Sequence, residues 1–457
     1  MGAGKSTVGG SVAHRLGRPF VDVDEAVAGE HGPIAELFAT QGEPAFREIE
    51  ARFVREALAR PGPAVIALGG GAVETPGLLP DDRATVVHLL VDVETAWFRA
   101  RRSHRPLARD AAEFRHRFEL RAPLYADVAD ATARDGDDVV LAAAGVYVDH
   151  GALPRLGELV AGDGPVALVS DPHVAGIHVM DAQLALGTRL AETHELPPGE
   201  EAKTLAALDR LWQDLSLDRS GTIVALGGGC TTDAAGFAAA TYLRGIAWTP
   251  VPTSLVAQVD AAIGGKTAID LPQGKNLVGA FHWPTRTVVD PAVLETLPDT
   301  QRLEGMAEVV KTGLLAGEPL WELPDAELVR RCAAFKSAVC LRDPHDEGPR
   351  HVLNLGHTFA HALEAAAGYE GLTHGRAVAL GLLAALRLSG RDTRVVEEVL
   401  RPQPVRVDRE RAWEAMKRDK KARGGEVRLV LLGTSGPEYG VVLPEADVRR
   451  ELDRLIA

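Results

Sequence analysis

The chain has 457 residues, 46% hydrophobic and 25% charged, and this composition is typical of a globular protein. That length exceeds what one compact core accommodates, so we expect two or three domains. The net charge of −14 argues against a nucleic-acid partner, and no apolar run reaches the roughly 18 residues of a membrane span.

The cysteine content agrees with a cytoplasmic location. The 3 cysteines form no CxxC pair and are too few for a disulfide framework, and we expect no signal peptide. Because nucleic acids and membranes are disfavoured, we expect small molecules as partners. Because the chain is acidic, any anionic ligand must be held by a local cluster of basic side chains.

The first residues, MGAGKSTV, indicate a phosphate-binding loop. The motif GxxxxGK[ST] cradles phosphates with backbone N–H groups, while its lysine contacts them and its hydroxyl binds Mg²⁺. Its end is supplied here by Gly4, Lys5, Ser6 and Thr7. The first glycine of the motif and the strand before it would precede Met1, and we expect an upstream extension of the reading frame to supply them. An N-myristoylation pattern explains fewer of these residues.

Acidic and basic positions follow this loop in a fixed order. FVDVDEAV places Asp22 and Asp24 at a predicted strand end, where they suit Mg²⁺ and substrate hydroxyls. The later positions are Arg47 in AFREIE, Gly70 in ALGGGAV, Arg105 in HRPLA and Arg121 in RAPLY. Any one of these arginines alone could be an exposed surface charge.

In this order and spacing, residues 1–135 resemble shikimate kinase. The resemblance implies a P-loop α/β kinase domain that lacks its first strand. It implies that Lys5 and Ser6 handle ATP and Mg²⁺. It further implies a lid at Arg105 and shikimate contacts from Asp24, Arg47, Gly70 and Arg121.

From about residue 140 a second nucleotide-binding pattern begins. PVALVSD reads as a buried strand, and GTIVALGGGCTTDAAGF as a strand, a glycine turn and a helix. Such a turn lets backbone N–H groups approach a pyrophosphate at a helix N-terminus, although a tight structural turn explains it equally well. IGGKTAIDLPQGKN then places Lys266, Lys275 and Asn276 in a loop-prone stretch that suits an anion.

Two later segments carry polar side chains at core spacing. EGMAEVVK places Glu308 and Lys311 one turn apart on an apolar helix, which favours a half-buried pair over a surface ion pair. In RHVLNLGHTFAHALE the steps of 4, 3 and 4 predict one helical face with Arg350, Asn354, His357 and His361. Such a polar stripe must face an ion, an anionic ligand or water, because unpaired burial is costly.

These residues offer two possible metal sites. Glu308, His357 and His374 provide one carboxylate and two imidazoles, a common catalytic zinc set with an open position. His357 and His361 form a competing i, i+4 pair. The spacing alone does not choose between the two.

Residues from about 140 to 457 resemble 3-dehydroquinate synthase, so the whole chain resembles a fusion of two enzymes of aromatic biosynthesis. The matching segments are GGGCTTDAAGF, YLRGI, QVDAAIGGKTAID, GKN, EGMAEVVK, RHVLNLGHTFAHALE, THGRAV and DKK. The resemblance implies an α/β nucleotide-binding domain followed by an all-helical metal and substrate domain. We accordingly predict domains at 1–137, 138–290 and 291–457.

The resemblance also implies roles for individual residues. The zinc or cobalt ligands are Glu308, His357 and His374, and His361 becomes a neighbouring group for proton transfer. The other substrate contacts are Asp260, Lys266, Asn276, Lys311, Lys336, Arg350, Asn354 and Lys421. Arg244 reaches the phosphate from a neighbouring subunit, which implies a homodimer. The NAD contacts are Asp171, Glu200, Lys203, Gly228, Gly229, Asp233, Thr253, Ser254, Lys275 and Thr296.

Alternatives to this interpretation remain. The synthase part could be another sugar-phosphate cyclase or a metal-dependent polyol dehydrogenase, and the kinase part a non-catalytic module. Asp346 and Arg376 stand where the resembled family usually has glutamate, and Ala360 where it has glycine. The first two departures could change the geometry around the metal ligands and so affect metal affinity.

Overall fold

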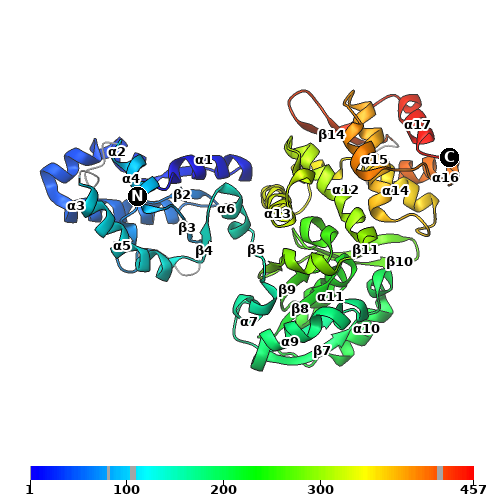
Figure 1. The fold of residues 1–457 in the computed structure, drawn as a ribbon, viewed down its shortest axis with the longest axis horizontal. Helices are drawn as coiled ribbons and strands as arrows, with labels where there is room; N and C mark the ends of the chain where they lie inside the picture. The colour runs from blue at the N-terminus through cyan, green and yellow to red at the C-terminus, as the bar shows by residue number, and fades with distance from the viewer. Residues whose placement is uncertain (1, 80–82, 103–109, 419–425) are drawn as a thin grey trace. The chain divides into compact units, whose positions relative to one another are not determined.

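The computed structural model describes residues 2–79, 83–102, 110–418 and 426–457 (Figure 1). The chain forms two compact units, residues 1–144 and 145–457. Arg105 and Lys421, both predicted site residues, lie outside the described residues. The domain limits predicted at 137/138 and 290/291 stay a prediction.

Unit 1 is built from short parallel strand pairs and helices. Its strands are β1 Phe20–Asp22, β2 Val65–Ala67, β3 Val87–Leu89 and β4 Ala131–Ala133. Its helices are α1 Lys5–Leu16, α2 Val23–His31, α3 Ile34–Leu58, α4 Val93–Ala100, α5 Ala111–Val128 and α6 Gly136–Ala143. β1 pairs with β2 and β3 with β4, and no described strand joins the two pairs. The carboxyl end of β1 lies beside that of β2, because Asp22 is in register with Ala67.

Unit 2 begins with a four-stranded parallel sheet in the order β7-β6-β8-β9. Its strands are β6 Val166–Ser170, β7 Leu190–Glu195, β8 Thr222–Gly227 and β9 Ala247–Pro252. Every residue of β6 and β8 is buried, as expected for strands covered on both faces. The helices around this sheet are α7 Leu156–Leu159, α8 Pro172–Val174, α9 Met180–Leu186, α10 Leu205–Asp214 and α11 Gly229–Thr241.

Two further strand pairs adjoin this sheet region. β5 Val146–Val148 pairs in parallel with β12 Thr287–Val289. β10 Lys266–Leu271 and β11 Gly274–Phe281 form an antiparallel hairpin. Lys266, Lys275 and Asn276 therefore lie on strands, and the prediction that they occupy a loop was wrong. Only Pro272 and Gln273 separate the two strands, so the glycines and the proline mark a tight turn rather than a long loop.

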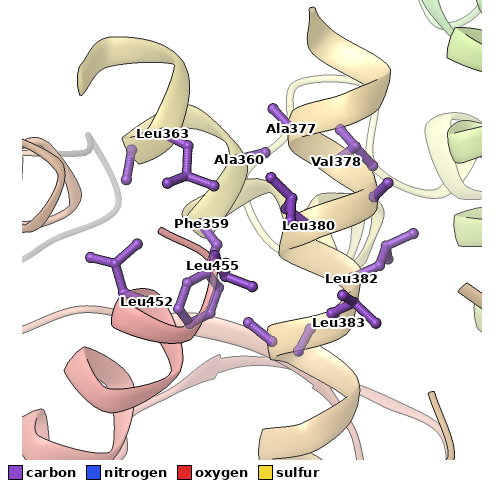
Figure 2. Close-up of a cluster of buried hydrophobic side chains, with 14 of the residues drawn as sticks. Phe359, Ala360, Leu363, Ala377, Val378, Leu380, Leu382, Leu383, Leu452 and Leu455 are labelled. Atoms are coloured by element: carbon purple, nitrogen blue, oxygen red, sulfur yellow. The ribbon is translucent and has the colours of Figure 1, made fainter. Parts of the chain in front are cut away.

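The last part of unit 2 is mostly helical. Its helices are α12 Asp299–Ala316, α13 Asp325–Arg342, α14 His357–Ala366, α15 His374–Leu388, α16 Arg409–Arg418 and α17 Glu445–Arg454. Figure 2 shows the core between α14, α15 and α17, where Phe359, Leu363, Leu380 and Leu452 pack together. Burying each such side chain stabilises the fold by about 1.5–3 kcal/mol.

The prediction of an all-helical domain was wrong in one respect. β13 Leu429–Leu432 and β14 Pro437–Val441 form an antiparallel hairpin within this region. The alternating burial of a two-stranded hairpin gives a weaker sequence pattern than the long apolar helices on either side.

The predicted polar stripe is also not one helix. Arg350 and Asn354 lie in a 3₁₀ helix over Pro349–Asn354, and α14 starts only at His357. Leu355 and Gly356 separate the two helices, and Gly356, the N-cap of α14, adopts φ 80°, a left-handed conformation that favours glycine. A side chain there would meet the backbone of Leu382 at 2.9 Å, so glycine lets α14 and α15 approach closely.

Candidate functional site

The middle of one helix and the N-terminal ends of two others bring one carboxylate and two imidazoles together. Glu308 comes from the middle of α12, His357 is the first residue of α14, and His374 is the first residue of α15. One ligand atom from each lies within 4.8 Å of the others. The Nε2 atoms of both histidines lie 3.5 Å from Glu308 Oε1.

The surroundings hold both imidazoles with Nε2 towards Glu308. His357 Nδ1 lies 3.2 Å from the carbonyl oxygen of Leu355, and His374 Nδ1 lies 3.4 Å from Glu364 Oε1. Such contacts fix the ring orientation of metal-binding histidines. Glu364 was missed in the sequence, although a carboxylate inside the apolar run HTFAHALEAA was a usable signal.

The protonation of these groups depends on their mutual contacts. Burial and the charge of Lys311 lower the pKa of His357 to about 4. Burial opposes the charge on His374 as well, but its bonds with Glu308 and Glu364 raise its pKa to about 10. Burial alone would raise the pKa of Glu308, yet Lys311 and the two imidazoles hold it well below its usual range.

This donor set fits a divalent transition metal. Glu308 is only 1% exposed, and its carboxylate faces Lys311 and both imidazoles. A buried carboxylate needs such cationic or hydrogen-bonding partners, and a metal ion between Glu308 and the two imidazoles would be one more. One carboxylate and two imidazoles suit Zn²⁺ or Co²⁺ with an open coordination position.

A buried network of charges adjoins Glu308. Lys311, also only 1% exposed, forms an ion pair with Glu308, and its Nζ lies 3.6 Å from Asp260 Oδ1. Lys336 Nζ lies 2.9 Å from the same carboxylate and 2.7 Å from the carbonyl oxygen of Asp260. Burial opposes the charge on Lys311, but Glu308 and Asp260 raise its pKa. Three predicted substrate residues thus share one network.

Arg350 is buried beside this network. Its guanidinium donates to the carbonyl oxygens of Gly264 at 2.9 Å and Pro344 at 3.2 Å. Its backbone N–H, with those of Glu347 and Gly348, donates to Asp343. Asp343 was missed in the sequence, because nothing in its spacing distinguishes this role.

The other predicted substrate residues occupy less enclosed positions. Asn354 donates to the carbonyl oxygen of His351 at 3.0 Å. The Lys266 side chain is 51% exposed and pairs with Asp346. His361 is exposed, with its ring centroid 5.5 Å from that of His357. Among the described residues, the group whose ligand atoms could share one metal ion is therefore Glu308, His357 and His374, without His361.

The predicted NAD residues gather at the carboxyl ends of the parallel strands. Asp171 follows β6, Gly228 is the N-cap of α11 and Gly229 its first residue, and Thr253 and Ser254 follow β9. This edge is where open α/β sheets bind ligands. Asp171 accepts from the Thr231 hydroxyl at 3.2 Å, which ties β6 to α11.

Other predicted NAD residues form ion pairs nearby. Lys203 Nζ lies 2.7 Å from Asp233 and also contacts Asn276, while Lys275 Nζ lies 2.5 Å from Glu200. Asn276, predicted for the phosphate, thus contacts a predicted NAD residue.

Two predicted residues stand apart in other ways. Thr296 lies 3.0 Å from His178 Nε2 through its hydroxyl. Arg244 is exposed. Its φ is 70°, and that of its neighbour Leu243 is also positive, at 51°.

Unit 1 has a pocket at the N-terminus of α1. Its lining includes Gly4, Lys5, Ser6, Thr7, Asp22 and Asp24. The Ser6 hydroxyl donates to Asp22, which also accepts backbone N–H groups of Asp24 and Glu25 at the start of α2. The pocket thus combines a helix N-terminus, a lysine and carboxylates, a set that suits a nucleotide phosphate with Mg²⁺.

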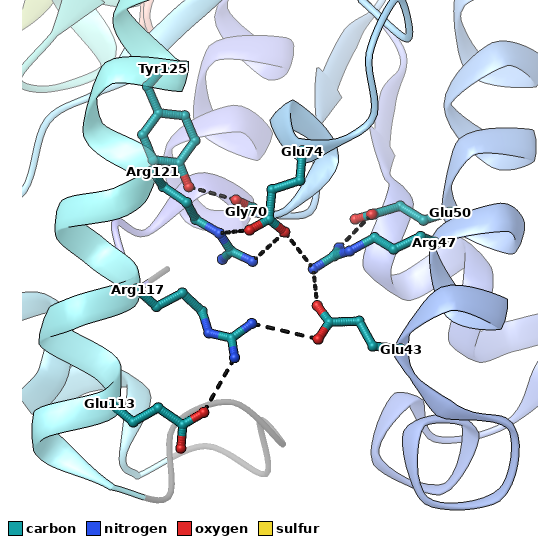
Figure 3. Close-up of polar contacts among 9 residues, drawn as sticks. All are labelled: Glu43, Arg47, Glu50, Gly70, Glu74, Glu113, Arg117, Arg121 and Tyr125. Carbon is teal, nitrogen blue, oxygen red and sulfur yellow. Dashed lines mark hydrogen bonds and ion pairs between the residues drawn. The ribbon is translucent and has the colours of Figure 1, made fainter.

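A second group of charges in unit 1 surrounds the predicted shikimate residues (Figure 3). Arg121 donates to both Glu74 oxygens, at 3.0 and 2.8 Å, and Arg47 donates to Glu74 at 3.1 Å. Arg47 also binds Glu50 at 2.6 Å and Glu43 at 2.8 Å. Glu74 was missed in the sequence, since only the folded chain places it between two arginines.

Tyr125 completes this region. Its hydroxyl donates to the carbonyl oxygen of Gly70 at 2.6 Å. Burial raises the pKa of Tyr125, so it acts as a hydrogen-bond donor.

Comparison with known families assigns both parts of the chain. Residues 193–304 match 3-dehydroquinate synthase N-terminal, and residues 305–422 match 3-dehydroquinate synthase C-terminal. The 3-dehydroquinate synthase of Gloeobacter violaceus is 43% identical over 347 residues, which cover 68% of this chain and 96% of the relative. This chain belongs to the 3-dehydroquinate synthase family. Residues 1–148 match shikimate kinase, so the chain is a fusion of shikimate kinase and 3-dehydroquinate synthase.

Other relatives agree with this assignment. The 3-dehydroquinate synthase of Pelobacter propionicus is 40% identical over 62% of this chain and 89% of the relative. A solved 2-deoxy-scyllo-inosose synthase, complexed with carbaglucose-6-phosphate, NAD⁺ and Co²⁺, matches with a TM-score of 0.60. It is 27% identical and covers 68% of this chain and 96% of that chain. The higher identity to the 3-dehydroquinate synthases favours that activity over another cyclase.

No helix in the described part of the synthase–kinase fusion has the length and apolar character needed to cross a membrane.

Proposed function

We propose that unit 2 converts 3-deoxy-arabino-heptulosonate 7-phosphate into 3-dehydroquinate and phosphate. The observation that carries the proposal is the donor set of Glu308, His357 and His374, with Glu308 and His357 buried, beside the charges of Lys311 and Asp260. A metal ion held by these donors would favour the alkoxide form of a substrate hydroxyl, and NAD would accept and return a hydride.

The surrounding side chains would orient a substrate that is anionic at both ends. Lys336, Arg350 and Asn354 would hold its carboxylate end, and a planar guanidinium suits that group. Lys266, Asn276, Lys311 and Lys421 would surround its phosphate. Asp260 holds Lys311 and Lys336 in place, and the exposed His361 would carry protons.

The NAD proposal is supported by the strand ends of the β6–β9 sheet. The helix N-terminus at Gly228 and Gly229 suits the pyrophosphate, and carboxylates at Asp171 and Glu200 suit ribose hydroxyls. The remaining proposed contacts are Lys203, Asp233, Thr253, Ser254, Lys275 and Thr296.

Phosphate release tests this function. The purified full chain, supplied with the heptulosonate phosphate, NAD⁺ and Zn²⁺ or Co²⁺, should release phosphate. The His357→Ala variant should lose this activity and the bound metal together, whereas Lys5→Ala should keep both. No phosphate release from the complete mixture would refute the synthase function of unit 2.

For unit 1 we propose transfer of phosphate from ATP to shikimate. Gly4, Lys5, Ser6 and Thr7 would bind ATP with Mg²⁺ on Ser6, and Asp24, Arg47, Gly70, Arg105 and Arg121 would bind shikimate. The pocket that joins Lys5, Ser6 and Asp24 supports this assignment. The expected result is shikimate-dependent ADP formation that Lys5→Ala abolishes. Shikimate binding without ADP formation would instead favour a non-catalytic module.

We also propose a homodimer through unit 2. The exposed side chain of Arg244 supports it, because the resemblance assigns this position to the phosphate site of a neighbouring subunit.

A further inference from the structure

Helix α15, which begins with the proposed metal ligand His374, lacks an acidic residue in its own first turn. Its third residue is Arg376, so a positive charge stands where the helix dipole favours a negative one. Thr373 occupies the N-cap position, yet its side chain makes no capping hydrogen bond to this helix. By its own sequence, the helix end that holds His374 is poorly stabilised.

Glu304 on the neighbouring helix α12 supplies the missing carboxylate. Its Oε2 accepts the backbone N–H of Gly375 at 2.7 Å, and its Oε1 accepts the Thr373 hydroxyl at 2.6 Å. These two donors flank His374 directly in sequence. The carboxylate therefore caps α15 from another helix, at the residue that carries the ligand.

The backbones of the two helices also touch at this point. A side chain on Gly375 would collide with the backbone of Glu304, so glycine is required for the close approach. Glu308 lies one helical turn beyond Glu304 on α12, and both face the first turn of α15. One side of α12 thus carries both the proposed ligand Glu308 and Glu304, which caps α15 next to the proposed ligand His374.

We propose that Glu304 is a positioning residue that holds His374 at ligand distance from Glu308 by capping α15 from α12. This inference rests on the proposed metal-dependent function of unit 2. Without Glu304, the first turn of α15 would keep an unpaired Gly375 N–H and the Arg376 charge with no carboxylate to offset them, and His374 would move away from Glu308.

The test uses the metal-stripped full chain and Co²⁺. Binding is measured by calorimetry and by the visible absorption of the bound ion, and the melting temperature of the metal-free protein is recorded separately. We expect Glu304→Ala to weaken Co²⁺ binding by about 10–100-fold. Glu304→Gln should have a smaller effect, because its amide oxygen can still accept one hydrogen bond, and it provides the measurement if the alanine variant does not fold.

Asp408→Ala is the matched control. Asp408 is an exposed carboxylate that caps the start of α16 through Arg411 N–H at 2.7 Å. Its loss should lower the melting temperature without changing Co²⁺ affinity. An unchanged Co²⁺ affinity in Glu304→Ala, or an equal loss in Asp408→Ala, would overturn the inference.

A rescue variant tests the capping mechanism itself. In Glu304→Ala with Arg376→Glu, the new glutamate would form a capping box with Thr373. Recovery of Co²⁺ affinity is expected, and weak binding that Arg376→Glu does not improve would refute capping as the cause. If the wild-type chain binds no Co²⁺, or His357→Ala binds it equally well, the proposed metal site itself fails.

Discussion

Glu74 places a carboxylate between the two arginines that are proposed to bind shikimate. Arg121 is buried and donates hydrogen bonds to Glu74 through Nε and Nη2. Glu74 also accepts a hydrogen bond from Arg47. A carboxylate substrate would need the same donors. At the scale of single residues, the arginines proposed to bind shikimate are therefore already paired with an internal acid.

We expect Glu74→Gln in the full chain to bind shikimate about 3–10-fold more tightly, because the charged competitor is removed while the shape is kept. Calorimetric titration with shikimate measures this. Glu113→Gln is the control, since Glu113 is exposed and pairs with Arg117 outside the two arginines. Weaker binding by Glu74→Gln would instead mean that Glu74 aligns the arginines.

Asp343 offers a stability prediction with a defined pH dependence. It accepts three backbone N–H groups at 2.8–3.1 Å in the turn that leads to Arg350. Burial would raise its pKa, but these hydrogen bonds lower it. A lowered pKa in the folded state stabilises the protein above the ordinary carboxyl range, and this stabilisation is lost as pH falls through the lowered pKa.

Asp343→Asn should therefore reduce the free energy of unfolding at neutral pH by about 1–3 kcal/mol. The difference from wild type should shrink in acid, as measured by denaturant unfolding across pH. Asp392→Asn, which removes an exposed acceptor of one backbone N–H, should cost less. A deficit for Asp343→Asn that is constant down to acid pH would contradict this account.

At the scale of elements, two of the three proposed ligands depend on where a helix begins. His357 and His374 are the first residues of α14 and α15, and the two helices pack closely in the core of Figure 2. Gly356 and Gly381 are in close backbone contact, since a side chain on Gly381 would collide with the Gly356 carbonyl. The contact lies directly before His357, the first residue of α14.

Replacing Gly356 by alanine should cost several kcal/mol of folding free energy, because it adds a backbone clash to the roughly 1–2 kcal/mol of left-handed strain. Co²⁺ affinity should fall as well, since His357 is the next residue. Gly368→Ala is a matched control, because Gly368 has φ 69° and open space around it. Equal losses in the two variants would show that only strain matters.

At the scale of the whole molecule, each proposed site lies within one of the two units. The kinase residues belong to residues 1–144, and the metal and NAD residues to 145–457. The proposed exception is Arg244, which would serve a second copy of unit 2.

Subunit mixing tests that exception. Arg244→Ala and His357→Ala should each be inactive in phosphate release. If Arg244 acts on the neighbouring subunit, each mixed dimer contains one intact site, so random mixing should restore about a quarter of wild-type activity. No recovery, with mixed dimers shown to form, would place Arg244 at its own subunit's site.

The sequence by itself determined the two-enzyme organisation and the choice of chemistry. GAGKST, the triple glycines, EGMAEVVK and RHVLNLGHTFAHALE predicted a P-loop, a nucleotide-binding turn and a carboxylate–imidazole set, because these depend on local order along the chain. Tertiary structure decided which groups meet. It joined His357 to Glu308 and His374 rather than to His361, broke the polar stripe at Gly356, and brought Glu74, Glu304 and Glu364 to their partners. Local spacing cannot give these contacts, since each joins side chains from different elements, and their distances are set by how closely the helices pack.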